Sequence, residues 1–245
     1  MSARSALVTG ASRGIGRHIA HRLVGEGYAL TLSARREPGL HEAARQLRAD
    51  GAEVHPVVAN LAIQPDVEQL VAAHTERFGQ LDLLVLNGGV GADARISEMP
   101  MKTYDLVLNV NLRAQFLLCQ QALPLLRRAA AADPVRGAKV IALASITGLA
   151  SEPGLGAYGA AKAGLISLCQ TLTVEESGNG VTATALAPGY VDTDMAASKH
   201  DSLGGHAMLT TNDVAELILA VTRLSAHAVV PTMVLTRAGD ELWRA

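Results

Sequence analysis

The sequence predicts an α/β fold in which a doubly wound parallel sheet of about seven strands carries helices on both faces. Two observations indicate this class. Apolar runs recur along the chain, and most are nearly continuous, which is typical of parallel strands covered on both faces. Helix-length segments separate these runs. The expected strands are Ala6–Val8, Ala29–Leu32, Glu53–Val58, Leu81–Leu86, Lys139–Ala144, Val181–Leu186 and Val229–Leu235.

Three of the intervening segments end at a glycine that can terminate a helix, which supports the alternation of strand and helix. Pro231 cannot donate to a ladder, so the last strand is expected at the sheet edge, or to begin at this residue. The stretch 130–138 ("AAADPVRGA") is expected to be only a loop, and residues 1–245 are expected to form one domain. The three helices are Ile15–Glu26 before Gly27, Leu40–Asp50 before Gly51, and Pro65–Phe78 before Gly79.

The composition argues against several classes of function. The net charge of the 245 residues is −2, which gives no electrostatic case for binding nucleic acid or an anionic membrane. Cys119 and Cys169 lie in apolar helical patterns and are expected to be reduced core thiols; no zinc-type spacing surrounds them, so no metal is expected. The chain shows no signal-peptide pattern and no apolar run near ~18 residues, so the expected location is the cytoplasm.

The stretch "VTGASRGIG" places three glycines directly after the first apolar run. In a parallel sheet this loop opens at the carboxyl edge, and the helix that follows points its free N–H groups at a ligand. Gly10, Gly14 and Gly16 would let the backbone approach a pyrophosphate, although the spacing is TGxxxGxG rather than GxGxxG. The pattern predicts a Rossmann-type dinucleotide site; a glycine-rich turn without a ligand is the alternative.

The end of the second strand favours NADP(H) over NAD(H). Dinucleotide folds usually carry an acid there that bonds the adenosine ribose, whereas this strand ends "LTLSARRE". Arg35 and Arg36 stand near the place of the acid, and Arg13 lies in the glycine loop. Guanidinium groups suit a 2′-phosphate because they form bidentate bonds to its oxygens. Ordinary solvated surface charge is the alternative interpretation of each arginine.

A second group of residues is typical of acid–base chemistry. Tyr158 and Lys162 are four residues apart in "AYGAAKAG", so on a helix they share one face. A cation one turn away is expected to lower the pKa of the phenol, which could then exchange a proton with a substrate oxygen. Ser145 ends the buried strand "KVIALAS" at the same sheet edge and could bond that oxygen. A turn or cap role for Ser145 is the alternative.

Together these motifs resemble the short-chain dehydrogenase/reductase family in its compact single-domain form, and within it the 3-oxoacyl-acyl-carrier-protein reductases. The resemblance runs from Ala6 to about Met195. It covers TGxxxGxG, Ser145 and YxxxK, and also Asn111 in "NVNLRAQF" and the segment "PGYVDTDM" from Pro188. Asn111 alone would be ambiguous, because an Asn inside an apolar helix is commonly a packing residue.

The resemblance implies a role for each matching residue. Tyr158 would be the general acid in reduction and the base in oxidation, Lys162 would bond the nicotinamide ribose, and Ser145 would hold the substrate carbonyl. Asn111 would fix a water that passes protons to Lys162. Thr193 would bond the nicotinamide carboxamide. The residues expected to contact the cofactor are Gly10, Ser12, Arg13, Gly14, Ile15, Gly16, Arg35, Arg36, Asn60, Leu61, Asn87, Gly88, Gly89, Tyr158, Lys162, Pro188, Gly189, Val191 and Thr193.

The chain departs from the family pattern at three places. The NNAG segment reads "LNGG", in which Leu86 extends the buried strand and Asn87 remains. The acid that usually faces adenine after the third strand is replaced by Asn60, whose side-chain carbonyl could still bond the adenine amine. The C-terminus lacks the family's usual glycine-bearing ending, and Trp243 near its end is expected to dock on a neighbouring surface.

The predicted function is NADP(H)-dependent hydride transfer between nicotinamide and a ketone or secondary alcohol, with carbonyl reduction favoured and a 3-oxoacyl thioester as the special case. The alternative is a non-catalytic NADP(H)-binding sensor on the same fold. A homotetramer or homodimer is expected. Residues 147–156, 90–95 and the loop after Pro188 should shape a mostly apolar pocket whose main charge is Glu152. His200 and His206 lie in that last loop and are expected to be solvated, with contact to the substrate as the alternative. Scattered surface charge is the favoured interpretation of the basic side chains that could meet an acidic carrier protein, which are Arg95, Lys102, Arg127, Arg128 and Lys199.

Overall fold

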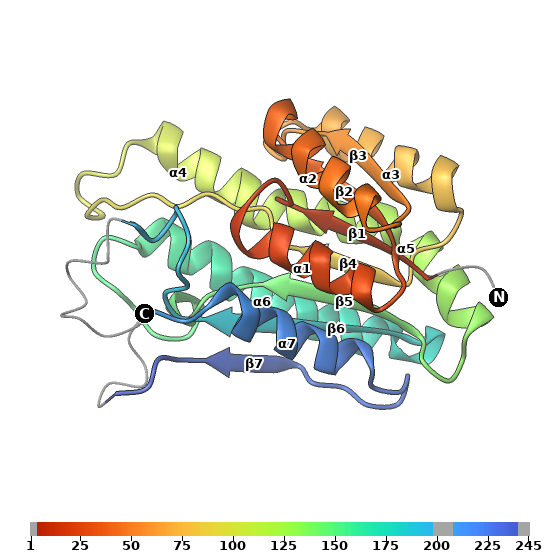
Figure 1. Ribbon diagram of the computed structural model, residues 1–245. Coiled ribbons are helices and arrows are strands. Elements are labelled where there is room, and N and C mark those ends of the chain that lie inside the picture. Colours follow the sequence, from red (N-terminus) through yellow and green to blue (C-terminus); the bar gives the residue numbers. More distant parts are fainter. Residues whose placement is uncertain (1–3, 198–207, 240–245) are drawn as a thin grey trace.

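The computed structural model describes residues 4–197 and 208–239 and contains a seven-stranded sheet in the order β3-β2-β1-β4-β5-β6-β7 (Figure 1). Every neighbouring pair of strands is parallel, which confirms the predicted doubly wound class. The strand order reverses between β1 and β4, and such switch points are where these sheets bind ligands. The strands are β1 Ser5–Thr9, β2 Ala29–Ala34, β3 Val54–Val58, β4 Leu83–Leu86, β5 Ala138–Leu143, β6 Val181–Pro188 and β7 Thr232–Leu235.

Helices cover both faces of the sheet, and alternate strand residues belong to two separate cores. Leu7 and Leu84 pack in the core formed with α3, α5 and α6, whereas Val8 and Val85 pack in the core formed with α1, α2 and α7. In the described residues, no helix is long and apolar enough to cross a bilayer. The helices are α1 Gly14–Gly25, α2 Glu37–Ala49, α3 Gln64–Phe78, α4 Met101–Leu108, a π-helical turn Asn109–Arg113, α5 Ala114–Ala132, α6 Gly156–Glu176 and α7 Thr211–Thr222.

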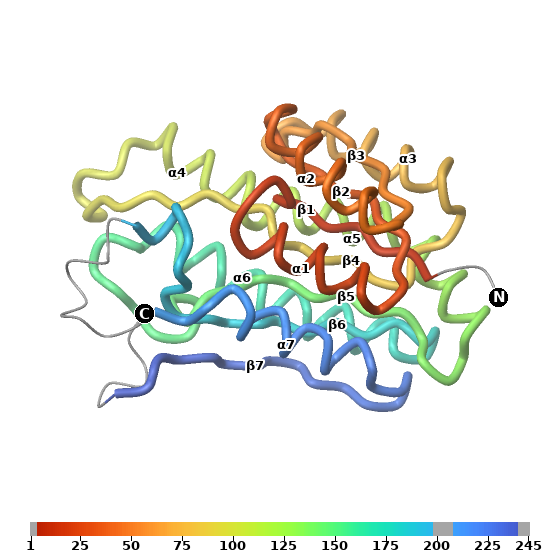
Figure 2. The backbone as a smooth tube through the Cα atoms, in the orientation of Figure 1, coloured from red at the N-terminus to blue at the C-terminus, as the bar shows by residue number. Residues whose placement is uncertain are grey.

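The carboxyl ends of the strands all lie at one edge, toward the left of the view in Figure 2, where the loop before α1 and the helix α4 also lie. Several boundaries differ from the predicted ones. The helix α5 continues to Ala132, three residues into the predicted loop, because its alanines are strong helix formers. The predicted strand from Val229 shortens to Thr232–Leu235. It is an edge strand directly after Pro231, as the missing N–H of that proline predicts.

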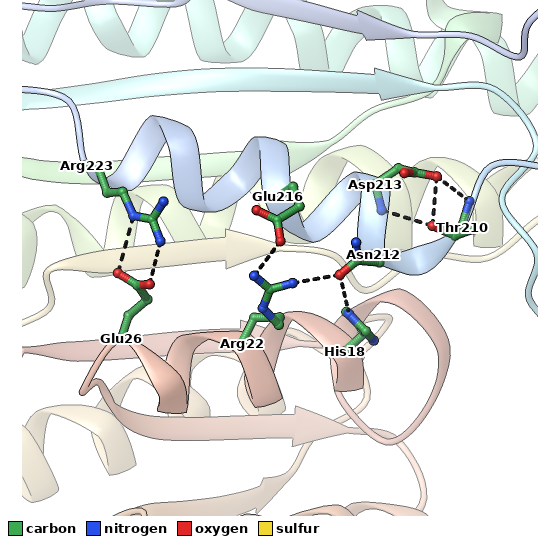
Figure 3. A network of polar contacts seen from close by, with 8 residues as sticks. All are labelled: His18, Arg22, Glu26, Thr210, Asn212, Asp213, Glu216 and Arg223. Atoms are coloured by element: carbon green, nitrogen blue, oxygen red, sulfur yellow. Dashed lines mark hydrogen bonds and ion pairs between the residues drawn. The ribbon is translucent and has the colours of Figure 1, made fainter.

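A polar network joins α1 to α7 on the outside of the sheet (Figure 3). Arg22 donates to Asn212 Oδ1 at 2.6 Å and pairs with Glu216, while Arg223 and Glu26 pair at 2.5 Å. Exposed pairs of this kind each contribute only about 0–1 kcal/mol. Their structural consequence is to align α1, whose first residue follows the glycine loop, with α7.

His74 is a fully buried titratable group on α3. Its Nε2–H donates to the carbonyl of Gln80 at 3.0 Å, and its Nδ1 accepts from the Thr31 hydroxyl at 2.8 Å, so the ring is a neutral tautomer bridging α3 and β2. Burial lowers the pKa of His74 from 6.5 to about 4. The unfolded chain therefore binds a proton at this residue at a higher pH than the folded chain does.

We predict that this one group lowers the free energy of unfolding by roughly 3 kcal/mol as the pH falls from about 6.5 to about 4, because the unfolded state gains a proton that the fold resists. Urea unfolding across that range should show a steeper pH dependence in the wild type than in His74→Gln. The exposed His41→Gln serves as the matched control and should keep the wild-type slope. Equal slopes in all three proteins would contradict the assignment.

Candidate active site at the carboxyl edge of the sheet

The glycine loop joins β1 to α1 and leaves the start of that helix open. Gly10 and Gly14 have positive φ angles of 66° and 54°. A Cβ at Gly16 would lie 2.4 Å from the carbonyl oxygen of Gly10, so only glycine fits there. Arg13 at the N-cap makes no side-chain capping bond, and the first turn carries no acidic residue. The free N–H groups and the positive end of the α1 dipole therefore fit the pyrophosphate of a dinucleotide.

The segment after β4 is bonded tightly to the end of β1. The backbone N–H groups of Asn87 and Gly88 donate to Thr9 Oγ1 at 3.0 and 2.9 Å. The Asn87 amide donates back to the carbonyls of Thr9 and Gly10, at 2.8 and 3.2 Å. The asparagine retained in "LNGG" thus supports the glycine loop through its side chain.

The structure also explains a departure from the family's NNAG segment. A Cβ at Gly88 would lie 2.6 Å from Leu61 Cδ1, so the side chain of Leu61 occupies the space that an alanine would need. Leu86 ends β4 and is 1% exposed, as expected for an extension of the buried strand. Asn60 Oδ1 accepts from the backbone N–H of Ala62 at 3.1 Å, which leaves one lone pair of that oxygen for the predicted adenine contact.

Ser145, Tyr158 and Lys162 meet at the same edge. Ser145 follows β5, accepts from the backbone and hydroxyl of Thr147 at 3.2 and 2.9 Å, and hydrogen-bonds the Tyr158 phenol. The Lys162 ammonium lies 5.4 Å from the centroid of the Tyr158 ring and donates to the carbonyl of Leu143 at 2.5 Å. The cap role considered for Ser145 is therefore present, and the same hydroxyl also contacts the Tyr158 phenol; its predicted bond to a substrate oxygen stays a prediction.

Burial controls the pKa values of the pair. It raises the pKa of Tyr158 to about 12, an effect that the hydrogen bond from Ser145 opposes, and it lowers the pKa of Lys162 to about 8. The expectation that Lys162 lowers the pKa of the phenol is not met in this structure. The reason is that loss of solvation outweighs the other contributions, and the ammonium is bonded to a backbone carbonyl.

Asn111 lies in the π-helical turn and is completely buried. Its Oδ1 accepts from the backbone N–H of Val90 at 3.0 Å, and its Nδ2 donates to the carbonyl of the same residue at 2.8 Å. A Cβ at Gly89 would lie 2.7 Å from Asn111 Oδ1 and 3.8 Å from Lys162 Nζ. Asn111 therefore holds the segment 89–90 close to Lys162. Single π turns of this kind are frequent at functional sites.

The predicted contacts after β6 lie across from the glycine loop. Pro188 ends β6, and Gly189 donates to the carbonyl of Leu235 at 2.8 Å. Val191 is buried, and a Cβ at Gly14 would lie 3.4 Å from the methyl group of Thr193. Thr193 of the motif "PGYVDTDM" therefore lies within contact distance of the glycine loop.

The three arginines expected near a 2′-phosphate differ from one another in their contacts. Arg35 and Arg36 are exposed directly after β2, whose Ser33 accepts from the glycine-loop residue Ala11 at 2.9 Å. The guanidinium of Arg13 instead donates to Asp194 Oδ2 at 2.8 Å. Both side chains of that pair are about three-quarters exposed (74% and 73%), so water competes strongly for it.

Two hydrogen bonds join segments that were expected to shape the pocket. Tyr190 donates to Glu152 Oε1 at 2.6 Å, and the backbone of Ala94 donates to the carbonyl of Gly154 at 3.0 Å. Sequence reasoning did not single out Tyr190, although it lies inside the quoted "PGYVDTDM" motif. His200, His206, Lys199 and Trp243 lie outside the described residues.

The basic side chains considered for a carrier protein do not form one patch. Arg127 and Arg128 lie near the end of α5, at the edge of the sheet opposite the site, and Arg127 pairs with Glu176 at 2.5 Å. Arg95 and Lys102 lie in and after the loop that follows β4, on the side of the site. These two pairs of charges lie at opposite edges of the sheet and therefore cannot act together on one partner surface.

A parallel sheet with this loop and a Ser-Tyr-Lys group at its carboxyl edge defines a dinucleotide-binding oxidoreductase. Residues 4–204 match the family model "short chain dehydrogenase", and the chain belongs to that family. It is 36% identical over 201 residues to a 3-oxoacyl-[acyl-carrier-protein] reductase of Staphylococcus epidermidis, covering 82% of this chain and 80% of that protein. It is also 33% identical over 196 residues to a 3-oxoacyl-[acyl-carrier-protein] reductase of Synechocystis, covering 80% of this chain and 77% of that protein.

Solved structures show the same similarity. A variant of actinorhodin polyketide ketoreductase with NADPH superposes with a TM-score of 0.86 at 28% identity, covering 99% of this chain and 98% of that chain. An alcohol dehydrogenase from the archaeon Thermococcus sibiricus, complexed with 5-hydroxy-NADP, gives a TM-score of 0.84 at 28% identity and 95% coverage of both chains. The fold therefore matches these neighbours over nearly their whole length.

The depressed pKa of Lys162 generates a stability prediction. The folded chain releases this proton near pH 8 and the unfolded chain near 10.5, so the wild type becomes more stable as the pH rises between these values. Lys162→Met removes that dependence. The free energy of unfolding of the variant relative to wild type should therefore decrease by roughly 3 kcal/mol from about pH 8 to about pH 10.5. Urea unfolding at both ends of this range measures it; a constant difference would show that the ammonium is not destabilised by burial.

Proposed function

We propose that this chain is an NADP(H)-dependent oxidoreductase that transfers a hydride between nicotinamide and a ketone or secondary alcohol, in the direction of carbonyl reduction. The observation that carries the proposal is the placement of Ser145, Tyr158 and Lys162 beside the open start of α1, at the switch point of the sheet. The oxidoreductases among its relatives and neighbours support the reaction class.

Each side chain then has a defined task. The reduced nicotinamide, when bound, supplies the hydride that adds to the carbonyl carbon. Ser145 holds the carbonyl oxygen by a hydrogen bond, and Tyr158 gives that oxygen its proton, so the carbonyl becomes a secondary alcohol. The high pKa of the phenol, about 12, keeps Tyr158 protonated at neutral pH, so it holds the proton that the carbonyl oxygen must receive. Oxidation of the alcohol runs through the same groups in reverse.

Lys162 has the properties of a proton relay behind Tyr158. Its pKa of about 8 lies near neutral pH, so it can lose and regain a proton during turnover. Its position beside Gly89 also suits the bond to the nicotinamide ribose that the family resemblance implies. The water expected on Asn111 stays a prediction, since the amide of that residue already bonds both backbone groups of Val90.

Tyr158→Phe tests the acid–base assignment. It should lower kcat about 10²- to 10⁴-fold, because the proton donor is lost while the ring remains, and it should change the Kd for NADPH less than about twofold. Tyr104→Phe, on the partly exposed α4, is the matched control and should behave as wild type. Steady-state kinetics and fluorescence titration measure the two quantities. Substantial activity in Tyr158→Phe would remove this phenol from the chemistry.

Cofactor choice is assigned to Arg35 and Arg36. They stand near where dinucleotide folds carry a ribose-binding acid, and both neighbouring structures named above contain NADPH or a derivative of NADP. Arg13 can join them only by leaving Asp194. That exchange costs little because the pair is exposed.

Arg35→Ala tests this assignment. It should raise the Kd for NADPH about tenfold to a hundredfold, since a charge-assisted bond to the 2′-phosphate is lost, and leave the Kd for NADH nearly unchanged. Arg45→Ala, an exposed arginine of α2 that pairs with Glu42, controls for a general change in charge. Equal weakening of both nucleotides in Arg35→Ala would contradict the 2′-phosphate contact.

The substrate class that the relatives favour is a 3-oxoacyl thioester, since two of them carry that activity in their names. Assembly as a homodimer or homotetramer is also proposed. An apolar groove between the π-helical turn, α5 and α6 supports it, because Leu112, Phe116 and Leu168 line a surface that a second copy could cover. Phe116 is 55% exposed in the single chain.

A further inference from the structure

Gln115 is a buried polar side chain that none of the proposed chemistry uses. It lies in the first turn of α5 and is only 1% exposed. Its Nε2 donates to the carbonyl of Gly88 at 2.9 Å and to the carbonyl of Val110 at 2.8 Å. Because both partners are acceptors, the orientation of the amide is determined. Gln115 therefore connects the loop after β4 to the π-helical turn that carries Asn111.

Packing and stability do not account for a glutamine at this position. Its Oε1 is buried and has no hydrogen-bond partner among the described residues. An unpaired buried acceptor destabilises the fold, because it loses its hydrogen bonds to water and gains none in return. The neighbours Ala114, Leu118 and Cys119 belong to the apolar core, where a Leu or Met would fill the same space without that cost. What distinguishes a glutamine from Leu or Met at this position is the pair of hydrogen bonds that its Nε2 donates to the carbonyls of Gly88 and Val110.

The carbonyl of Gly88, to which Gln115 donates, belongs to the segment 88–90. This segment lies between the glycine loop and Lys162. On one side a Cβ at Gly10 would lie 2.9 Å from Gly88 Cα, so Gly88 lies against the glycine loop. On the other side a Cβ at Gly89 would lie 3.8 Å from Lys162 Nζ. A shift of this segment would displace the glycine loop and the surroundings of Lys162 together.

We infer that Gln115 is a positioning residue, which acts with Asn111 as the second of two amide clamps on residues 88–90. The two side chains are four residues apart, and each bonds the backbone of this segment. This inference rests on the proposed function, because it assigns the segment to the nucleotide site. It requires that loss of the Gln115 amide weakens NADPH binding and slows turnover without destabilising the fold.

Gln115→Met is the direct test, since it keeps the length of the side chain and removes the donor. Removing the unpaired Oε1 offsets the loss of a partner for the Gly88 carbonyl, so the thermal midpoint should move by less than about 3 °C. The Kd for NADPH should rise about tenfold, and kcat with acetoacetyl-coenzyme A, or with whichever carbonyl compound the wild type reduces, should fall about tenfold to a hundredfold. The KM for the carbonyl substrate should stay within about twofold.

Gln121→Met, the same substitution at an exposed position of α5, is the matched control and should leave all four quantities at wild-type values. If Gln115→Met does not fold, Gln115→Glu keeps the length and, when protonated, one O–H donor, so it should show the same changes to a smaller extent. Unchanged values of Kd and kcat in the folded variant would overturn the inference. It would also be overturned if activity fell only as far as a lower thermal midpoint accounts for, through loss of folded protein. Failure of the wild type to bind NADPH or NADH would instead overturn the proposed function, and this role with it.

Discussion

The site depends on the two hydrogen bonds that Thr9 Oγ1 accepts from the backbone of Asn87 and Gly88. They join the ends of β1 and β4, the strands between which the sheet changes direction. Parallel pairing brings these ends to the same edge, and the small side chains there allow the two loops to touch. These bonds fix the glycine loop against the segment 87–88. Asn111 and, in our inference, Gln115 bond the backbone of residues 88–90 and hold this segment in place.

The chemistry and the stability of the fold make opposite demands on the same residues. Lys162 and Tyr158 are held where loss of solvation shifts both pKa values toward the neutral forms, which opposes the charged lysine at neutral pH. Gln115 adds an unpaired acceptor inside the core. Such local costs are expected at functional sites, because the surrounding sheet and helices are stable enough to bear them.

Much of the fold could be predicted because central parallel strands are buried on both faces, so runs such as Leu83–Leu86 stay apolar. The prediction made the edge strand β7 three residues too long at its start. The residues of this strand are partly exposed, and its limits depend on pairing with β6. The candidate catalytic group of Ser145, Tyr158 and Lys162 was recognisable from the local spacing of Tyr158 and Lys162 and from the place of Ser145 at the end of a buried strand. The π-helical turn, the Arg13–Asp194 pair and the Gln115 clamp depend on contacts between distant segments. Only the polar Gln115 in the apolar stretch "AQFLLC" was a visible signal of them.

The central claim is that this edge of the sheet transfers a hydride from NADPH to a carbonyl carbon while Tyr158 supplies the proton. The most direct measurement is to incubate the protein with NADPH deuterated at the reactive nicotinamide carbon and a panel of ketones, diketones and 3-oxoacyl thioesters. Mass spectrometry then locates the label in each product. We predict one deuterium on the carbinol carbon, and a rate of label transfer about 10²- to 10⁴-fold lower with Tyr158→Phe. Tight NADPH binding without label transfer to any member of the panel would contradict the claim and favour a nucleotide-sensing role.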